Sequence, residues 1–89
     1  MVYGMQIQLK FFASVREALN TAQESIELPA GVQTIGDVRR HLQQRGGVWT
    51  EVLAQGRSLR MACNQQMGDE STPVTPGCEV AFFPPVTGG

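Results

Sequence analysis

An alternation of apolar and polar residues close to the start of the chain narrows the available folds more than any other feature. Within Met5 to Ala13 (MQIQLKFFA), apolar side chains first fall on every second residue. The apolar positions are Ile7, Leu9 and Phe11, and the polar positions are Gln6, Gln8 and Lys10. A period of two predicts a strand that buries one face and exposes the other. The chain has 89 residues, the length of one domain, so we expect a sheet with helical cover on its buried face.

A helix over Thr34 to Arg45 is the clearest candidate for that cover. Thr34 and Asp37 stand three residues apart, an arrangement that resembles a capping box at the helix start. The apolar stripe of this helix consists of Ile35, Val38 and Leu42, which recur at helical spacing. Gly46 and Gly47 follow the last turn and end the helix. The pattern predicts that the apolar stripe packs on the sheet.

The other expected elements are short. They are a helix over Ser14 to Asn20 capped by Ser14, a strand over Glu24 to Leu28, a helical turn over Val48 to Ala54, a strand over Leu59 to Asn64, a polar loop over Gln65 to Pro76, and a strand over Glu79 to Phe83. The first two strands favour a hairpin-like pair. Strands grouped around one well-formed helix predict an α+β domain. We assign residues 1–83 to this domain and residues 84–89 to an extended C-terminal tail.

Composition argues against several classes of partner. Seven basic and eight acidic residues give a net charge of -1, whereas proteins that bind nucleic acid usually carry a basic excess. Arg39, Arg40 and Arg45, with His41, fall on the main helix beside Asp37 and are interpreted as a solvated face. No apolar run approaches the roughly 20 residues that cross a bilayer, and the N-terminus does not resemble a signal peptide. We therefore expect a cytoplasmic protein with no nucleic-acid or membrane partner.

Motifs for catalysis and metal binding are missing from the sequence. It contains no Gly-rich phosphate loop, no dinucleotide-binding glycine pattern, no GxSxG and no HExxH pair. Cys63 and Cys78, with a single histidine, cannot complete a four-ligand zinc site and are interpreted as small buried side chains. We expect no bound cofactor, no metal and no catalysis by the chain alone.

Large apolar side chains are expected on the open face of the sheet. The alternation over Glu79 to Phe83 directs Phe82 to one face and Phe83 to the other. If the first and last strands are neighbours, Phe83 and Phe12 share the open face, and Met67 from the polar loop can join them. Exposed apolar groups on an otherwise polar face indicate a partner surface. The alternative is that a loop covers them.

The last six residues, PPVTGG, suit a terminus that enters another protein. Pro84 and Pro85 favour extended backbone, while Gly88 and Gly89 have no Cβ and follow a narrow path. Extended, this tail spans up to roughly 20 Å. The carboxylate of Gly89 is a poor acyl donor, so an ATP-using partner must first convert it to an acyl-adenylate. The acyl group then accepts sulfur as a thiocarboxylate, or passes to an amine.

Three segments resemble the small subunit of molybdopterin synthase, a family of sulfur carriers with the ubiquitin-like β-grasp fold. They are KFFASVREAL near the N-terminus, NQQ at Asn64 to Gln66, and GCEVAFFPPVTGG at the end. The resemblance implies a mixed sheet packed on one main helix, with a flexible Gly-Gly tail. It also implies a hydrophobic docking surface at Phe12, Met67 and Phe83. The tail residues of the implied partner interface are Pro84, Pro85, Val86 and Thr87.

The resemblance further implies a mechanism. An adenylating enzyme related to ubiquitin activators would form the acyl-adenylate on Gly89, and a sulfur donor would convert it to a thiocarboxylate. The tail, narrow at Gly88, would enter the large subunit, which supplies the catalytic residues. Two sulfur transfers to cyclic pyranopterin monophosphate would build the dithiolene of molybdopterin, in an assembly that is usually a heterotetramer.

Three alternatives stay open on the residues alone. One is a related carrier for thiamin or tRNA thiolation, with the same chemistry at Gly89 and another acceptor. Another is a protein modifier that conjugates Gly89 to lysines. The third is an interaction module in which the Gly-Gly terminus is incidental.

Overall fold

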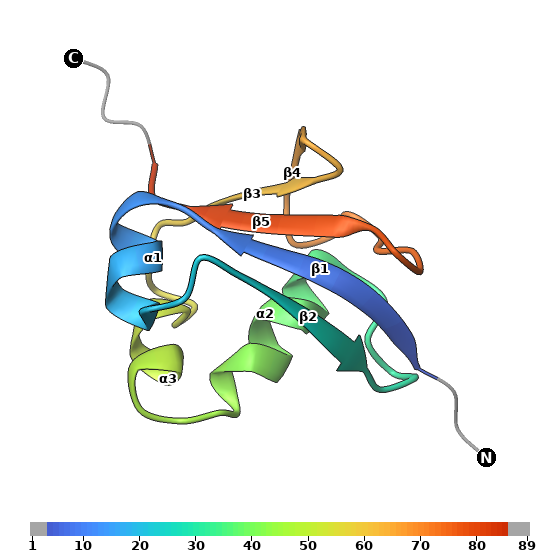
Figure 1. Cartoon of the computed structure of the whole chain (residues 1–89), viewed down its shortest axis with the longest axis horizontal. Coiled ribbons are helices and arrows are strands. Elements are labelled where there is room, and N and C mark those ends of the chain that lie inside the picture. The colour runs from blue at the N-terminus through green and yellow to red at the C-terminus, as the bar shows by residue number, and fades with distance from the viewer. Residues whose placement is uncertain (1–3, 86–89) are drawn as a thin grey trace.

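The computed structural model describes residues 4–85, in which a five-stranded sheet carries three helices on one face (Figure 1). The elements in chain order are β1 (Met5–Phe11), α1 (Ala13–Leu19), β2 (Gln23–Leu28), α2 (Ile35–Gln43), α3 (Val48–Val52), β3 (Arg60–Cys63), β4 (Gln66–Gly68) and β5 (Glu79–Phe83). The other face of the sheet carries no helix within the described residues. This arrangement confirms the predicted α+β class.

The strand order is β2-β1-β5-β3-β4, so the first and last strands are neighbours at the centre of the sheet. β1 pairs antiparallel with β2, as the expected hairpin-like pair, and parallel with β5. β3 then pairs antiparallel with both β5 and β4. One parallel pair among antiparallel ones makes the sheet mixed. The parallel pair is possible because the long connection between β1 and β5 contains the helices.

The hydrophobic core lies between the sheet and the helices. It is built by the alternating residues of the central strands and by the apolar stripe of α2, as the sequence predicts. The fully buried members include Ile7, Leu9, Phe11, Ile35, Val38, Leu42, Leu53, Val80 and Phe82. The ring of Phe11 stacks on Phe82 with 6.2 Å between centroids, and it meets Trp49 edge-on at 5.6 Å. These aromatic contacts join the two central strands to α3.

A capping box fixes the start of α2. The Thr34 hydroxyl accepts a hydrogen bond from the Asp37 backbone N–H at 3.2 Å, and the Asp37 carboxylate accepts from the Thr34 N–H at 3.2 Å. The Gln33 N–H also donates to this carboxylate at 3.0 Å. Hydrogen bonds from Gln33 and Arg40 hold the pKa of Asp37 below its ordinary value. The predicted helix start is therefore confirmed, and the helix ends at Gln43, two residues before the predicted end.

The predicted cap of α1 by Ser14 is wrong. The N-cap residue is Phe12, and no side chain caps this helix within the described residues. Ser14 already lies inside the first turn, because the chain turns sharply at Ala13, whose φ is 52°. The Phe12 carbonyl accepts from the Val15 N–H at 3.1 Å, which starts the helix without a hydroxyl.

The predicted polar loop over residues 65–76 contains a strand. β4 pairs antiparallel with β3 through a two-residue turn, with Cys63 opposite Gln66. Both turn residues have positive φ, 51° at Asn64 and 68° at Gln65, which is the geometry of a type I′ hairpin. The Asn64 side chain also accepts a hydrogen bond from the Glu79 N–H at 2.9 Å. The sequence signal is weak because this turn lacks the usual glycine and the strand is three residues long.

The positive φ values of this turn predict that a glycine substitution there stabilises the domain. Replacement of Gln65 by glycine should raise the free energy of unfolding by about 0.5–1 kcal/mol. A left-handed conformation costs about 1–2 kcal/mol for a residue with a Cβ, and glycine avoids this cost. Part of the gain is offset because glycine loses more backbone entropy on folding. Urea denaturation measures the change. The matched control is Gln66→Gly, which places glycine in extended β4 and should lower the same free energy. Equal losses in both variants would contradict the assigned turn.

Arg39 is buried, so its predicted place on a solvated face is wrong. Its exposed fraction is 3%. The Nε group donates to the Leu53 carbonyl at 2.8 Å, and a terminal nitrogen donates to the Arg57 carbonyl at 3.0 Å and also to the Ala54 carbonyl. Arg39 lies four residues after Ile35 and so shares the buried side of α2. Its guanidinium fixes the path of the chain from α3 to β3.

Adjacent arginines on α2 allow a matched test of this role. Arg39→Lys should lower the free energy of unfolding by about 2 kcal/mol, because an ammonium cannot reproduce the fork that serves three carbonyls. Arg40→Lys should change it by no more than about 0.5 kcal/mol, because Arg40 is exposed and, among residues 4–85, pairs only with Asp37. Equal effects in denaturant titrations would show that the Arg39 hydrogen bonds do not hold this segment.

Candidate functional site

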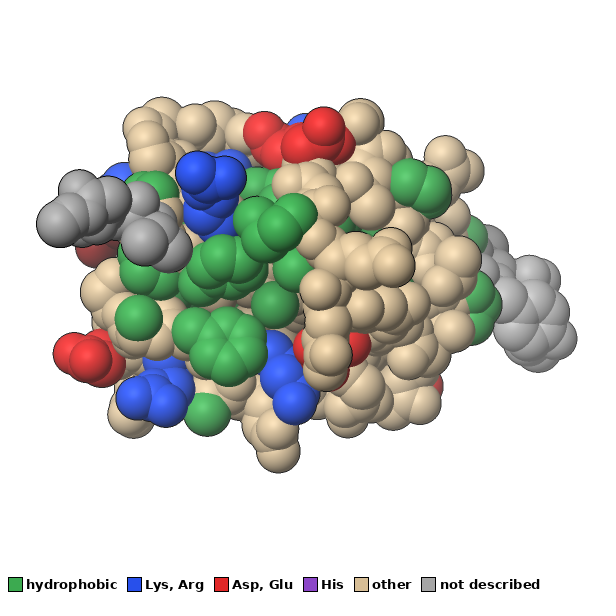
Figure 2. All heavy atoms as spheres, turned by 90° about the horizontal axis from the view of Figure 1, so that it is seen from above, with side chains coloured by type: hydrophobic (Ala, Val, Ile, Leu, Met, Phe, Trp, Pro, Cys, Tyr) green, Lys and Arg blue, Asp and Glu red, His purple; other side chains and the backbone are tan. Residues whose placement is uncertain are grey.

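The face of the sheet opposite the helices carries an apolar surface, which we call the open apolar face. It consists of Phe12, Ala62, Met67, Ala81 and Phe83. Phe12 is 46% exposed and Met67 is 60% exposed. Figure 2 looks onto this side of the molecule and shows apolar side chains gathered near the middle, with Lys and Arg side chains on either side. Large apolar groups are therefore available to a partner rather than covered by a loop of the described chain.

Phe12 and Phe83 form the centre of this face. Their rings meet edge to face, with 6.4 Å between centroids and 81° between planes. They meet because Phe11 and Phe82 are register partners in the parallel β1–β5 pair, and the next residue of each strand turns to the other side. The Phe12 N–H donates to the Phe82 carbonyl at 3.3 Å and continues this pairing past the end of β1. The predicted sharing of the open face by these two residues is confirmed.

Met67 joins the same face through β3. It lies opposite Ala62, and Ala62 lies opposite Ala81 on β5. The two alanines are 7% and 5% exposed although no helix covers them. Ala62 and Ala81 therefore contribute small apolar side chains to this face, between β4 and β1. The sequence placed Met67 in a loop of undefined position. The type I′ turn places it on β4 and on the open apolar face.

The base of the C-terminal tail borders this face. A cavity of about 440 Å³ is lined by Phe12, Ala13, Phe83, Pro84 and Pro85, all of them apolar. The tail therefore leaves the domain directly beside the Phe12–Phe83 pair. The other predicted tail residues, Val86, Thr87, Gly88 and Gly89, lie outside the described residues. Their assigned roles stay predictions.

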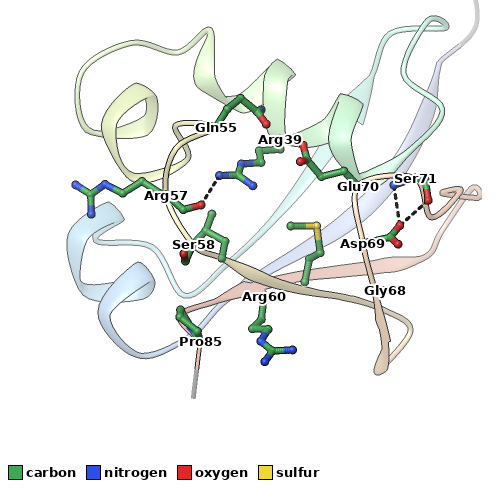
Figure 3. Close-up of a pocket in the computed structure, with 12 residues that line it drawn as sticks. Arg39, Gln55, Arg57, Ser58, Arg60, Gly68, Asp69, Glu70, Ser71 and Pro85 are labelled. Atoms are coloured by element: carbon green, nitrogen blue, oxygen red, sulfur yellow. Dashed lines mark hydrogen bonds between the residues drawn. The ribbon is translucent and has the colours of Figure 1, made fainter. Parts of the chain in front are cut away.

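A second hollow, of about 780 Å³, lies on the other side of Pro85 (Figure 3). Residues of the α3–β3 segment and β3 form one wall, and the turn after β4 forms the other. The charged residues that line it are Arg39, Arg57, Arg60, Asp69 and Glu70. Burial lowers the pKa of the Arg39 guanidinium, and the nearby Glu70 carboxylate opposes this shift. Sequence reasoning missed this hollow, although Arg60 stands two residues before Ala62 in a strand and so belongs to the open side.

The Asp69 carboxylate is hydrogen-bonded within its own turn. Its carboxylate accepts hydrogen bonds from the Ser71 N–H at 2.9 Å and from the Ser71 hydroxyl at 2.6 Å. These bonds hold the pKa of Asp69 below its ordinary value. Asp69 therefore stays ionised and shapes the loop.

The cysteines lie apart from this face, on the inner side of the sheet. Both are free thiols; Cys78 is buried and Cys63 is half-buried. Burial and the neighbouring Cys78 thiol raise the pKa of Cys63 above its ordinary value, which lowers its reactivity as a nucleophile. Among residues 4–85, no group of three potential metal ligands comes together, and no helix is long and apolar enough to span a bilayer.

Comparison with known proteins gives one consistent family. Residues 9–89 match the ThiS family. The chain is 41% identical over 83 residues to the molybdopterin synthase sulfur carrier subunit of Escherichia coli (strain K12), and 40% identical over 83 residues to that of Haemophilus influenzae (strain ATCC 51907 / DSM 11121 / KW20 / Rd). Each match covers 93% of this chain and 99% of the relative.

A solved structure supports the same fold. The chain superposes on one chain of the structure of the protein–protein complex of subunits 1 and 2 of the molybdopterin-converting factor from Helicobacter pylori 26695, with a TM-score of 0.64 and 23% identity. The alignment covers 96% of this chain and 100% of that chain. The ubiquitin-like β-grasp fold is thereby confirmed. The chain belongs to the ThiS family, and its curated relatives are molybdopterin synthase sulfur carrier subunits.

Two neighbouring phenylalanines distinguish the open apolar face from the core. Phe82→Ala should lower the free energy of unfolding by about 3–5 kcal/mol, because it empties a buried site. Phe83→Ala should cost only about 1 kcal/mol, the order of one aromatic pair at the surface, because Phe83 is half-buried. Chemical denaturation of both variants provides the measurement. A similar loss at both positions would place Phe83 in the core.

Proposed function

We propose that this chain is the sulfur carrier subunit of a molybdopterin synthase. Its Gly89 carboxyl group carries sulfur as a thiocarboxylate to the large synthase subunit, where the sulfur enters the dithiolene formed on cyclic pyranopterin monophosphate. The observation that carries the proposal is the apolar docking face beside the base of the tail, in a chain 41% identical to a sulfur carrier subunit. The face that binds the large subunit and the tail that delivers the sulfur then start next to each other.

The domain acts by binding and positioning. Phe12 and Phe83 bury apolar surface against the large subunit, and this burial offsets the entropy lost when the tail is ordered. Pro84 and Pro85 have restricted φ, so fewer conformations must be given up as the tail enters the partner. The catalytic residues belong to the large subunit, and we propose that two carriers and two large subunits form a heterotetramer in the cytoplasm.

Charging of the tail requires two further partners. An adenylating enzyme uses ATP to join the Gly89 carboxylate to AMP, with release of pyrophosphate. A sulfur donor then supplies a sulfide equivalent that attacks the carboxyl carbon and displaces AMP, leaving the thiocarboxylate. ATP is therefore a substrate consumed by the partner enzyme, and this chain binds no cofactor in the proposed reaction.

Intact mass spectrometry tests the chemistry. Incubation with the adenylating enzyme, ATP and a sulfur source should raise the mass of the chain by the difference between one sulfur and one oxygen atom. A variant that lacks Gly89 should stay uncharged yet keep the same denaturation midpoint, because β5, the last described strand, ends at Phe83. A chain that remains a carboxylate under these conditions would contradict the carrier proposal.

The products also separate the alternatives. A protein modifier would give species of higher mass that survive denaturation and thiol reagents. A carrier for thiamin or tRNA thiolation would form the thiocarboxylate but would not yield molybdopterin when mixed with the large subunit and cyclic pyranopterin monophosphate. Formation of molybdopterin in that mixture is the result expected here.

A further inference from the structure

We propose that Arg60 is a specificity-determining residue of the docking face, and that it pairs with a carboxylate on the large synthase subunit. This inference rests on the proposed function, because it assumes that the large subunit covers the open apolar face. It adds an ionic requirement to an interface otherwise described by its apolar residues.

Arg60 lies directly beside the centre of the docking face. It is the register partner of Phe83 in the antiparallel β3–β5 pair, and side chains of such partners stand as immediate neighbours on one face. Met61, the next residue, points into the core, so Arg60 points to the open side. Figure 3 shows its side chain on the opposite side of β3 from Arg39. A partner that covers Phe83 therefore also covers part of Arg60.

The guanidinium of Arg60 has no internal partner among residues 4–85. The ion pairs of the described chain join Lys10 to Glu79, Arg40 to Asp37, and Arg45 to Glu24. The two acidic residues across the hollow are engaged elsewhere, since Asp69 accepts bonds from Ser71 and Glu70 lies near Arg39. Arg60 thus keeps its donors for another molecule.

Covering an unpaired guanidinium is unfavourable, which is why the partner must supply an acceptor. Removal of a charge from water is costly unless the charge is paired and hydrogen-bonded. The planar fork of arginine matches a carboxylate through two parallel hydrogen bonds. The charge-assisted hydrogen bonds that a carboxylate accepts are also stronger than those accepted by a neutral carbonyl, so an anionic acceptor is favoured. The partner is a protein, so the anion is the side chain of Asp or Glu.

Binding measurements with charge variants test this pairing. The full chain is titrated against the purified large subunit, and the dissociation constant and association rate are measured at several salt concentrations. Arg60→Gln should weaken binding about tenfold or more, Arg60→Glu should weaken it further, and Arg60→Lys should fall between the parent chain and Arg60→Gln. The salt dependence of association should be shallower for Arg60→Gln than for the parent chain.

Arg40 provides the matched control. It lies on α2, on the helical side of the sheet, and Arg40→Gln and Arg40→Glu change the net charge by the same amounts. Binding by these variants should stay within about twofold of the parent chain, since a distant exposed charge acts only through screened long-range attraction. Denaturation curves of all variants check that each domain is folded.

The outcomes separate this inference from the proposed function. Unchanged binding by Arg60→Gln and Arg60→Glu would overturn the role of Arg60, while weaker binding by Phe83→Asp would still support the docking face. Equal, salt-independent losses in both Arg60 variants would indicate a neutral acceptor and overturn the carboxylate. Absence of binding by the parent chain would overturn the proposed function and this inference with it.

Discussion

The parallel pairing of β1 with β5 is the interaction on which the rest of the molecule depends. It joins the N-terminal β1–β2 ribbon to the β5–β3–β4 half of the sheet. The same register places Phe11 beside Phe82 in the core and lets Phe12 meet Phe83 on the open side. One set of backbone hydrogen bonds therefore determines both the packing of the domain and the geometry of the open apolar face.

The sequence could predict the elements that carry a clear hydrophobic period or a helix-capping pattern. The alternation in β1 correctly divided buried from more exposed side chains, the alternation in β5 correctly assigned Phe82 and Phe83 to opposite faces, and the Thr34–Asp37 box correctly marked the start of α2. These signals are local and repeat over several residues. The shared open face of Phe12 and Phe83 followed from them once the two strands were assumed to be neighbours.

The misses depended on contacts between distant segments or on unusual backbone. β4 was not predicted, because it is short and polar and its turn has Asn64 and Gln65 where glycine is usual. Burial of Arg39 depends on carbonyl groups contributed by the α3–β3 segment, which composition does not reveal. The position of Arg60 beside Phe83 depends on the register of the β3–β5 pair, which neither strand's sequence gives alone.

The central position of β5 has a consequence for the timing of synthesis. β5 follows every other described element in the chain, yet it is the strand that links the two parts of the sheet. A ribosome delivers the β1–β2 ribbon and the β3–β4 hairpin before the strand that unites them, and a polypeptide released before residue 79 has neither a closed sheet nor a Phe12–Phe83 pair. The Phe12–Phe83 pair and the link between the two parts of the sheet are thus completed together, by the last strand to be synthesised.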